Sequence, residues 1–385
     1  MCYLRDDVSF PCKSFDHMLR KLLFISSVIF LMSFNSIAQT TPLKVGVIGL
    51  THTHVHWILG RENIGDIEIV GIVEPNRELA QRYADQHGYS MSIVFKTMAE
   101  MIAAKKPEAV TAFGTIYEHL EVVEFCAPKG IHVMVEKPLA VNMEHANKMA
   151  ALAKKHNIHL LTNYETTWYP SNHKLKELLD QGKIGDMRKV IVNDGHKGPK
   201  KIGVNSEFLD WLTDPVQNGG GAITDFGCYG ANLMTWLQEG KRPISVTAVT
   251  QQFQAENNPK VDDEATIILS YSDAQATIQP SWNWPIGRKD MEVYGLTGVM
   301  YADNRNNLRI RMSEGYDGFS EEKLELPERE APYNDPFSLF EAVIRNKIQL
   351  KPFDLSSLEN NMIVVEILDA AKKSAITKKT VVLKK

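Results

Sequence analysis

Short apolar runs alternate with amphipathic stretches along residues 43–163, and this alternation limits most strongly what the chain can fold into. The apolar runs have the length of buried strands and lie at residues 43–50, 67–74, 108–114, 131–138 and 158–163. The stretches between them have helical spacing, and two of them end at a glycine. A β-α-β-α order predicts a parallel sheet covered by helices on both faces. We therefore expect an α/β domain at residues 42–163.

The pattern changes after residue 163. A helix is expected near residues 171–181, and strands then dominate, at residues 188–195, 244–254, 264–272, 276–284 and 290–298. A glycine-rich segment with helical character interrupts them at 218–237, and residues 357–375 form a strongly amphipathic helix. This half predicts a second, α+β domain at residues 164–385, with a mostly antiparallel sheet and a C-terminal helix that packs back.

The first 38 residues have the composition of a targeting segment. Arg20 and Lys21 precede an apolar stretch, residues 22–34, that is too short to span a bilayer comfortably. A small-x-small site ends at Ala38. We predict a secretory signal peptide over residues 1–38, with translation starting at Met18, and therefore an exported, periplasmic protein with no membrane segment after cleavage. An N-terminal anchor helix is the alternative.

Charge and cysteine content exclude several classes of protein. The net charge of −4 gives no basic excess, so we expect no nucleic-acid partner. Only Cys126 and Cys228 remain after the predicted cleavage, which is too few for a disulfide framework, so both are expected to be small buried residues.

The segment "GLTHTH", residues 49–54, stands where a dinucleotide-binding turn would carry G-x-G-x-x-G. Gly49 is kept, and Thr51 and His54 replace the other two glycines. Such a turn brings the backbone and a helix N-terminus to a pyrophosphate. Glu74 ends the second apolar run, where a carboxylate would bind the adenosine ribose hydroxyls and repel a 2′-phosphate. NAD is therefore expected rather than NADP, although Arg77 keeps NADP open.

The histidines of this segment also permit a metal site. H-x-H after a first strand resembles the start of metal-dependent amidohydrolases, with His52 and His54 as ligands. Such a site needs further His and Asp ligands from later strands, but His119, His132 and His159 stand at helix or strand positions without a metal-ligand pattern. We expect no metal. The histidines can also be the polar first residues of a helix, which is compatible with a dinucleotide site.

Two further motifs connect the chain to a known family. They are "HVMVEKPLA" at residues 132–140 and "GGGAITDFGCYGANLMTWL" at residues 219–237. With these motifs, the chain resembles the glucose–fructose oxidoreductase and inositol dehydrogenase family, written Gfo/Idh/MocA, from Lys44 to the end. The resemblance implies an N-terminal Rossmann domain, a C-terminal domain with an open, mostly antiparallel sheet, an NAD(P)-dependent oxidoreductase activity, and a homo-oligomer formed through that sheet.

The resemblance also implies catalytic roles for Lys137, Asp225 and Tyr229. Lys137 follows a strand at the carboxyl edge of the sheet, and Pro138 restricts its backbone. An ammonium can stabilise a developing alkoxide, and burial can lower its pKa towards a useful range. Tyr229 can relay the substrate's proton if a nearby ammonium lowers its pKa, and it can also be a core aromatic.

The remaining expected contacts are divided between cofactor and substrate. The cofactor set shares the carboxyl edge of the first sheet: Gly49, Thr51, His52, His54, Glu74, Gly114, His119, Glu136 and Lys137. At "GTIYEH", residues 114–119, the family's T-P-N-x-x-H is reduced to its histidine, so contacts there are expected to differ. The substrate set follows the last Rossmann strand or carries polar or indole groups: Asn163, Glu165, Trp168, His196, Lys197 and Trp282. Each of these can also be structural.

We expect an oxidoreductase that oxidises a hydroxyl of a small carbohydrate, a sugar or glycoside: the hydroxyl loses its proton through Tyr229 and Lys137, and its carbon gives hydride to NAD. Free NAD is scarce outside the cytoplasm, so export favours a tightly bound cofactor. The alternatives are an NAD-dependent glycosidase, with Glu165 or His196 as an extra base, a metal-dependent hydrolase, and a non-catalytic sugar-binding protein.

Overall fold

The computed structural model describes residues 41–383. The predicted signal peptide lies outside these residues and stays a prediction. Pro42–Lys385 form one compact unit that contains two sheets, one of six strands and one of nine. Among the described residues, no helix is both long enough and apolar enough to cross a membrane.

The six-stranded sheet is parallel and has the order β3-β2-β1-β4-β5-β6. Its strands are β1 Leu43–Ile48, β2 Ile67–Val73, β3 Val94–Phe95, β4 Ala109–Ala112, β5 His132–Glu136 and β6 Leu160–Asn163. The strand order reverses between β1 and β4. In open α/β sheets, ligands bind outside the carboxyl ends of the strands at such a reversal.

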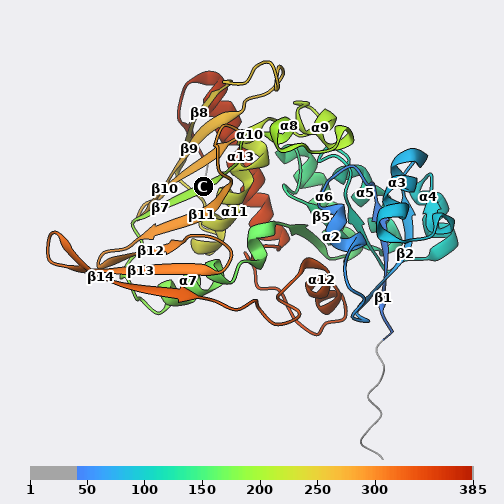
Figure 1. Cartoon of the computed structure of the whole chain (residues 1–385), viewed down its shortest axis with the longest axis horizontal. Helices are drawn as coiled ribbons and strands as arrows, with labels where there is room; N and C mark the ends of the chain where they lie inside the picture. The colour runs from blue at the N-terminus through green and yellow to red at the C-terminus, as the bar shows by residue number, and fades with distance from the viewer. Residues whose placement is uncertain (1–40, 384–385) are drawn as a thin grey trace, which may run out of the picture. The chain divides into compact units, whose positions relative to one another are not determined.

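Helices cover both faces of this sheet (Figure 1). They are α2 Val55–Leu59, α3 Arg77–His87, α4 Met98–Lys105, α5 His119–Cys126 and α6 Met143–His156. Successive strand residues belong to different cores: Met134 packs in the core that contains α2 and α3, whereas Val133 and Val135 pack in the core that contains α5 and α6. Period-two alternation between two apolar cores explains why these strands read as continuous apolar runs.

The nine-stranded sheet has the order β14-β13-β12-β11-β7-β10-β9-β8-β15, and only the β7–β10 pair is parallel. Its strands are β7 Lys189–Gly195, β8 Ser245–Gln251, β9 Glu264–Ser270, β10 Gln275–Ser281, β11 Arg288–Tyr294, β12 Gly298–Ala302, β13 Asn307–Glu314, β14 Gly318–Glu325 and β15 Val381–Val382. The predicted fold class, a Rossmann-type parallel sheet followed by a mostly antiparallel one, is confirmed. The sequence analysis did not predict β13 or β14.

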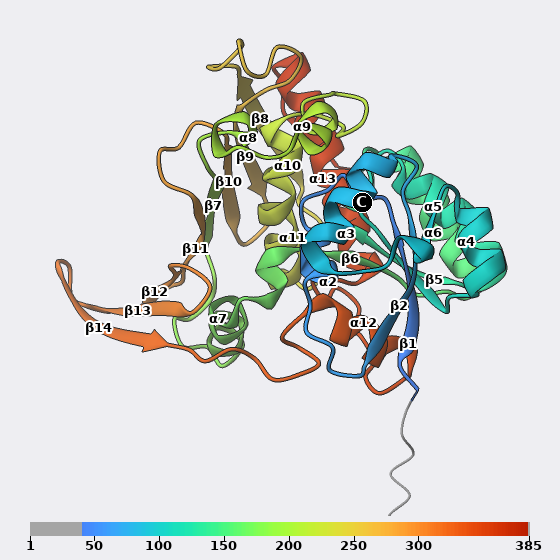
Figure 2. The ribbon, with the colours of Figure 1, turned by 45° about the vertical axis from the view of Figure 1, so that its right-hand side comes forward.

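One face of the second sheet packs against α11 Gly227–Leu237 and α13 Leu358–Thr377 (Figures 1 and 2). The remaining helical segments are η1 Met91–Ile93, η2 Ala127–Lys129, η3 Glu165–Trp168, α7 Pro170–Asp180, α8 Pro199–Ile202, α9 Ser206–Leu212, α10 Ala222–Asp225 and α12 Pro336–Ile344. Helix α12, which was not predicted, contacts β2, and α13 contacts β6 and α6. The division into domains at residues 163 and 164 stays a prediction, since C-terminal helices pack on the first sheet.

Candidate active site

The turn after β1 requires glycine at its first position. Gly49 has φ +76°, and a Cβ there would lie 2.8 Å from the backbone nitrogen of Gly114, so a side chain meets both strain and overlap. A cavity of about 330 Å³ opens at this edge, lined by Gly49, Gly114 and Val73 among others. The turn and the cavity therefore lie at the reversal of strand order, the position of a dinucleotide site.

Glu74 holds this turn together. It is buried, and its carboxylate accepts hydrogen bonds from the backbone N–H groups of Leu50 at 3.0 Å and Asn76 at 2.8 Å. Burial raises the pKa of Glu74, and these two hydrogen bonds oppose that shift. The acid thus has a structural role that the sequence analysis missed. Its binding of the ribose hydroxyls stays a prediction.

Two buried polar atoms near the turn have no hydrogen-bond partner among the described residues. They are Thr51 Oγ1 and His119 Nε2. His119 Nδ1 bonds the carbonyl of Leu139 at 3.1 Å, and burial lowers the pKa of His119 to about 4, so the ring is neutral. Buried polar atoms normally have partners. Together with the cavity that His119 helps to line, these atoms fit a bound dinucleotide.

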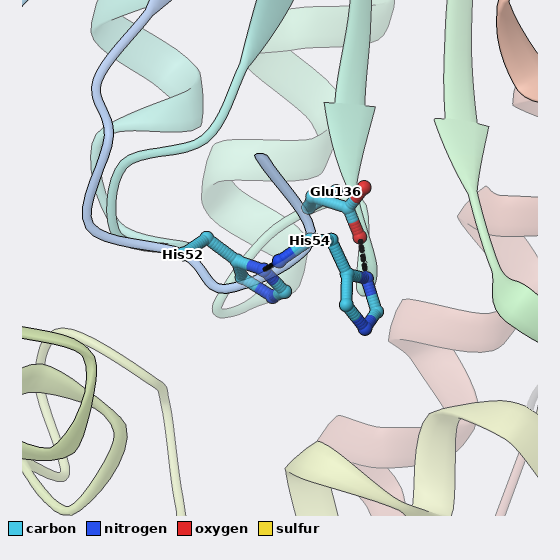
Figure 3. A group of neighbouring side chains, drawn as sticks. All are labelled: His52, His54 and Glu136. Carbon is cyan, nitrogen blue, oxygen red and sulfur yellow. Dashed lines mark hydrogen bonds and ion pairs between the residues drawn. The ribbon is translucent and has the colours of Figure 1, made fainter. Parts of the chain in front are cut away.

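A chain of hydrogen bonds leads from the turn to the end of the sheet. His54 Nδ1 bonds Glu136 Oε2 at 2.8 Å, as Figure 3 shows, and Asn163 Nδ2 donates to Glu136 Oε1 at 2.7 Å. Trp168 Nε1 then donates to Asn163 Oδ1 at 3.0 Å. Asn163 and Trp168 are predicted as substrate contacts, but these polar atoms are already engaged in hydrogen bonds that hold the site's side chains in place.

His52 fastens the turn to α9. Its Nδ1 accepts the backbone N–H of His54 at 3.1 Å (Figure 3), and its ring lies 4.8 Å from that of Phe208 and 5.7 Å from that of Trp211, centroid to centroid. Burial, followed by the charge of His54, lowers the pKa of His52 well below its usual value. A neutral, packed imidazole is a positioning element for the turn.

His52, His54 and Glu136 are the one group in residues 41–383 with three ligand atoms close enough for a metal, all within 4.8 Å of one another. Hydrogen bonds already engage Nδ1 of both histidines and both oxygens of Glu136. These four atoms therefore already belong to a hydrogen-bonded network, and Nε2 of each histidine is the atom that a metal would have to use. The expectation of no metal stays a prediction.

Lys137 and Asp225 form a buried ion pair at the carboxyl end of β5. Lys137 Nζ bonds Asp225 Oδ1 and donates to the Asp225 carbonyl at 2.9 Å, and Trp282 Nε1 donates to Asp225 Oδ2 at 3.0 Å. Burial is the largest single effect and lowers the pKa of Lys137, but the charge and hydrogen bond of Asp225, together with Cys228 and Glu136, outweigh it and the net shift is upward. The expectation that burial brings this lysine's pKa down was wrong, because its counter-ion is buried with it.

Asp225 is positioned by a residue that the sequence analysis missed. The carboxylate of Asp262 accepts hydrogen bonds from the backbone N–H groups of Gly221 at 3.0 Å and Ile223 at 2.7 Å, which fixes the glycine-rich segment ahead of α10. A Cβ on Gly221 would overlap the backbone of Asp262. The motif's third glycine therefore permits the close approach that brings Asp225 to Lys137.

Tyr229 lies between two ammonium groups. Lys137 Nζ and Lys289 Nζ are each 5.1 Å from the centroid of its ring, a cation–π distance. Burial, followed by the charge of Glu165, raises the pKa of Tyr229 well above its usual value. The expectation that a nearby ammonium lowers the pKa of this phenol was wrong, because burial dominates. Tyr229 is therefore a protonated donor.

Glu165 belongs to the same cluster but is a poor base. It pairs with Lys289 and accepts the Tyr169 hydroxyl at 2.6 Å. Burial is the largest single effect and raises the pKa of Glu165, but the charge and hydrogen bond of Lys289, together with Tyr169 and His54, outweigh it and bring the value to about 2. The ion pair with Lys289 does not favour Glu165 as an extra base, and that alternative role stays a prediction.

The other predicted substrate contacts differ in their outcome. His196 accepts the backbone N–H of Gly198 on Nδ1 at 3.0 Å, and burial lowers its pKa, so it is neutral with its proton on Nε2. Nε2 therefore cannot act as the extra base in this tautomer. Lys197 is exposed, and no ion pair of its ammonium is found among the described residues. Trp282 is fully buried against Asp225, so it cannot offer its face to a sugar, and that prediction was wrong.

Lys289 and Asp194 are members of the cluster that the sequence did not identify. They face each other on β11 and β7, so their side chains share one face of the sheet. Both carboxylate oxygens of Asp194 are buried without a partner among the described residues, and burial raises its pKa well above the usual value. Both strands carry several charged or polar residues, so no signal in the sequence singles out these two.

A parallel sheet with a dinucleotide turn at its reversal, next to a buried lysine–aspartate–tyrosine cluster, defines an NAD-binding oxidoreductase. Residues 43–164 match the model described as an oxidoreductase family with an NAD-binding Rossmann fold, and residues 172–301 match the GFO/IDH/MocA C-terminal domain. The chain belongs to the Gfo/Idh/MocA family.

Similar proteins are dehydrogenases and oxidoreductases. Trans-1,2-dihydrobenzene-1,2-diol dehydrogenase of Xenopus tropicalis is 29% identical over 221 residues, which are 56% of this chain and 61% of that protein. The enzyme of that name from Homo sapiens is 26% identical over 231 residues, which are 60% and 63%. The chain thus matches about three fifths of the length of these relatives.

Two solved structures share the fold over most of the chain. An aldose-aldose oxidoreductase from Caulobacter crescentus, complexed with glycerol, has a TM-score of 0.72 and 20% identity, covering 89% of this chain and 100% of that one. An inositol dehydrogenase homolog from Azotobacter vinelandii, complexed with NAD+, has a TM-score of 0.76 and 16% identity, covering 89% and 98%. At these identities, the likeness concerns the fold alone.

Proposed function

We propose that this protein oxidises and reduces a hydroxyl carbon of a sugar or glycoside, using NAD. One observation carries the proposal: the buried Lys137–Asp225 pair, with Tyr229 beside it, stands at the same sheet edge as the dinucleotide turn. NAD, when bound there, accepts or returns the hydride. Gly49, Thr51 and His119 would hold it, since they supply the close backbone approach and the unpartnered polar atoms.

The described protonation states suit the reductive direction. Lys137 is charged and Tyr229 is protonated, so both can donate to the oxygen of a carbonyl as it becomes a hydroxyl. Asp225 fixes the ammonium of Lys137 and keeps it charged. Oxidation runs the same steps backwards, so the proton must leave a site whose pKa is high.

A cyclic substrate with neighbouring hydroxyls is the chemistry common to the relatives' names. They describe a dihydrodiol dehydrogenase, an aldose oxidoreductase and an inositol dehydrogenase homolog. A sugar ring carries the same vicinal hydroxyls. The glycosidase alternative needs a base that removes a proton from a carbon atom of the sugar. Glu165 is unsuited to that role because Lys289 helps to keep its pKa near 2.

Three further properties are part of the proposal. Glu74 at the end of β2 supports NAD rather than NADP, and the signal-like segment at residues 18–38 supports export with a tightly bound cofactor. A homo-oligomer formed through the open second sheet is also part of the proposal, and it is supported by membership of the Gfo/Idh/MocA family. Light scattering of the mature protein tests the oligomer.

The experiment that tests the function is a cofactor assay. Protein purified without added nucleotide is denatured, and the released cofactor is identified by mass spectrometry. The native protein is then incubated with a panel of sugars, glycosides and inositols, and the nicotinamide absorbance is followed. NAD release and cofactor reduction by a member of the panel are expected. If calorimetry shows that the protein binds neither NAD nor NADP, the proposal is overturned.

A further inference from the structure

A second cavity adjoins the catalytic cluster on the side of Glu165. It has a volume of about 360 Å³ and is lined by Trp57, Glu165, Trp168, Arg61, Arg305 and the start of α12. Small-molecule sites usually span about 300–1,000 Å³. The cavity is therefore at the small end of that range and has room for a small ligand such as one sugar ring. We name it the Trp57–Trp168 pocket.

Glu165 is the connection between this pocket and the chemistry. It lines the pocket and pairs with Lys289, whose ammonium lies 5.1 Å from the centroid of the Tyr229 ring. One ion pair therefore separates the pocket from the proposed proton donor. A ligand that occupies the pocket and also reaches Tyr229 must extend past this pair, so it is longer than one sugar ring.

Both indoles of the pocket are held in place by the cofactor end of the site. Trp57 stacks on His54 with centroids 3.8 Å apart and an interplanar angle of 15°, and Trp168 Nε1 bonds Asn163. Indoles that are already fixed lose little conformational freedom when a ring packs on them. Trp168 is only 4% exposed, so the half-buried Trp57 is the indole that can offer apolar surface to the C–H face of a pyranose.

Most charged groups of the pocket are already paired, which favours a neutral ligand, and Glu62, which also lines the pocket, is exposed to solvent. Arg61 already pairs with Asp66 and Asp335, and Arg305 pairs with Glu328. Neither arginine therefore needs a phosphate or carboxylate from a ligand. Glu165 is similarly neutralised by Lys289. Compensated charges can still exchange hydrogen bonds with hydroxyl groups.

We propose that the Trp57–Trp168 pocket binds the second ring of a neutral glycoside while the first ring is oxidised at Lys137 and Tyr229. This inference rests on the proposed function and names its substrate class: disaccharides or aryl glycosides rather than free monosaccharides. The pocket would supply binding energy remote from the reacting carbon, which enzymes use to position the reacting part.

The test fills the pocket from its rim. Ile64 lines the pocket and is 57% exposed, so Ile64→Trp adds bulk there without disturbing a core. Ile244→Trp is the matched control, since Ile244 is 50% exposed and does not line the pocket. The probes are glucose, methyl β-glucoside, cellobiose, lactose, maltose and sucrose. Cofactor reduction gives kcat/KM for each, and calorimetry gives binding of the disaccharides.

The expected result is a ratio. The ratio is kcat/KM for the best disaccharide divided by kcat/KM for glucose. It should fall roughly tenfold or more in Ile64→Trp and Trp57→Ala, and keep its wild-type value in Trp57→Phe and Ile244→Trp. An unchanged ratio in both Ile64→Trp and Trp57→Ala overturns the inference. If no sugar reduces the cofactor, the proposed function fails instead, and calorimetry decides the pocket: disaccharide binding that Ile64→Trp weakens supports it, and no binding overturns it.

Discussion

Asp225→Asn is expected to destabilise the protein because it leaves the ammonium of Lys137 buried without a counter-ion. The side chains of Lys137 and Asp225 are only 6% and 7% exposed, so water cannot replace the lost partner. Removing one partner of a buried ion pair costs about 3–5 kcal/mol. The asparagine oxygen can still accept the Trp282 hydrogen bond, so the loss reports the charge rather than the packing.

The pH dependence of this loss has a definite sign. In the native pair the pKa of Lys137 is raised and that of Asp225 is lowered. The ion pair's contribution to the free energy of unfolding is therefore fully present between the pKa values of the two groups in the unfolded chain, about 4 for Asp225 and about 10 for Lys137. It is lost only outside that pH window. Without Asp225, burial alone lowers the pKa of Lys137. The variant's deficit is then largest near neutrality and shrinks as the pH rises towards about 10.

The assay is urea unfolding followed by tryptophan fluorescence at pH 7 and pH 9.5. Wild type, Asp225→Asn and the double variant Lys137→Met, Asp225→Asn are compared, because removing both charges should recover most of the loss. A loss below about 1 kcal/mol at pH 7, or a double variant no more stable than Asp225→Asn, would refute the buried-pair reasoning.

The remaining predictions concern catalysis and the cofactor turn. Lys137→Met and Tyr229→Phe should each lower the rate of cofactor reduction about 10²–10⁴-fold. The double variant should lose far less than the product of the two single losses, because the residues act as a unit. Wild-type rates in both single variants would show that these residues are not catalytic. Oxidation should speed up with rising pH, since the proton leaves a site of raised pKa, and a pH–rate profile that falls between pH 7 and 10 contradicts this. Gly49→Ala should abolish NAD binding in calorimetry, whereas Gly88→Ala, with the same φ of +76° and open space around it, should not; equal affinities would argue against a close-packed turn. Elemental analysis should find no stoichiometric transition metal, and about one zinc per chain would reverse the hydrogen-bonded interpretation of the histidines.

The sequence by itself determined the order of elements in the first half and the position of the site. Apolar alternation and helix caps are local: Asn76 and Thr97 cap α3 and α4 within three residues of their own positions. Two motifs then located Lys137 and Asp225, which the structure brings into contact across 88 residues. The motifs located both residues through the family resemblance, which needs no knowledge of that contact.

Only the tertiary structure decided how the site's groups are charged. The pKa values of Lys137 and Tyr229 follow from burial and from partners that are remote in sequence, so the sequence analysis gave both the wrong sign. Lys289 and Asp194 share the site because β11 pairs with β7, a register that no local pattern encodes. Electrostatic energy depends on distance and on exclusion of water, and both are set by packing between segments far apart along the chain.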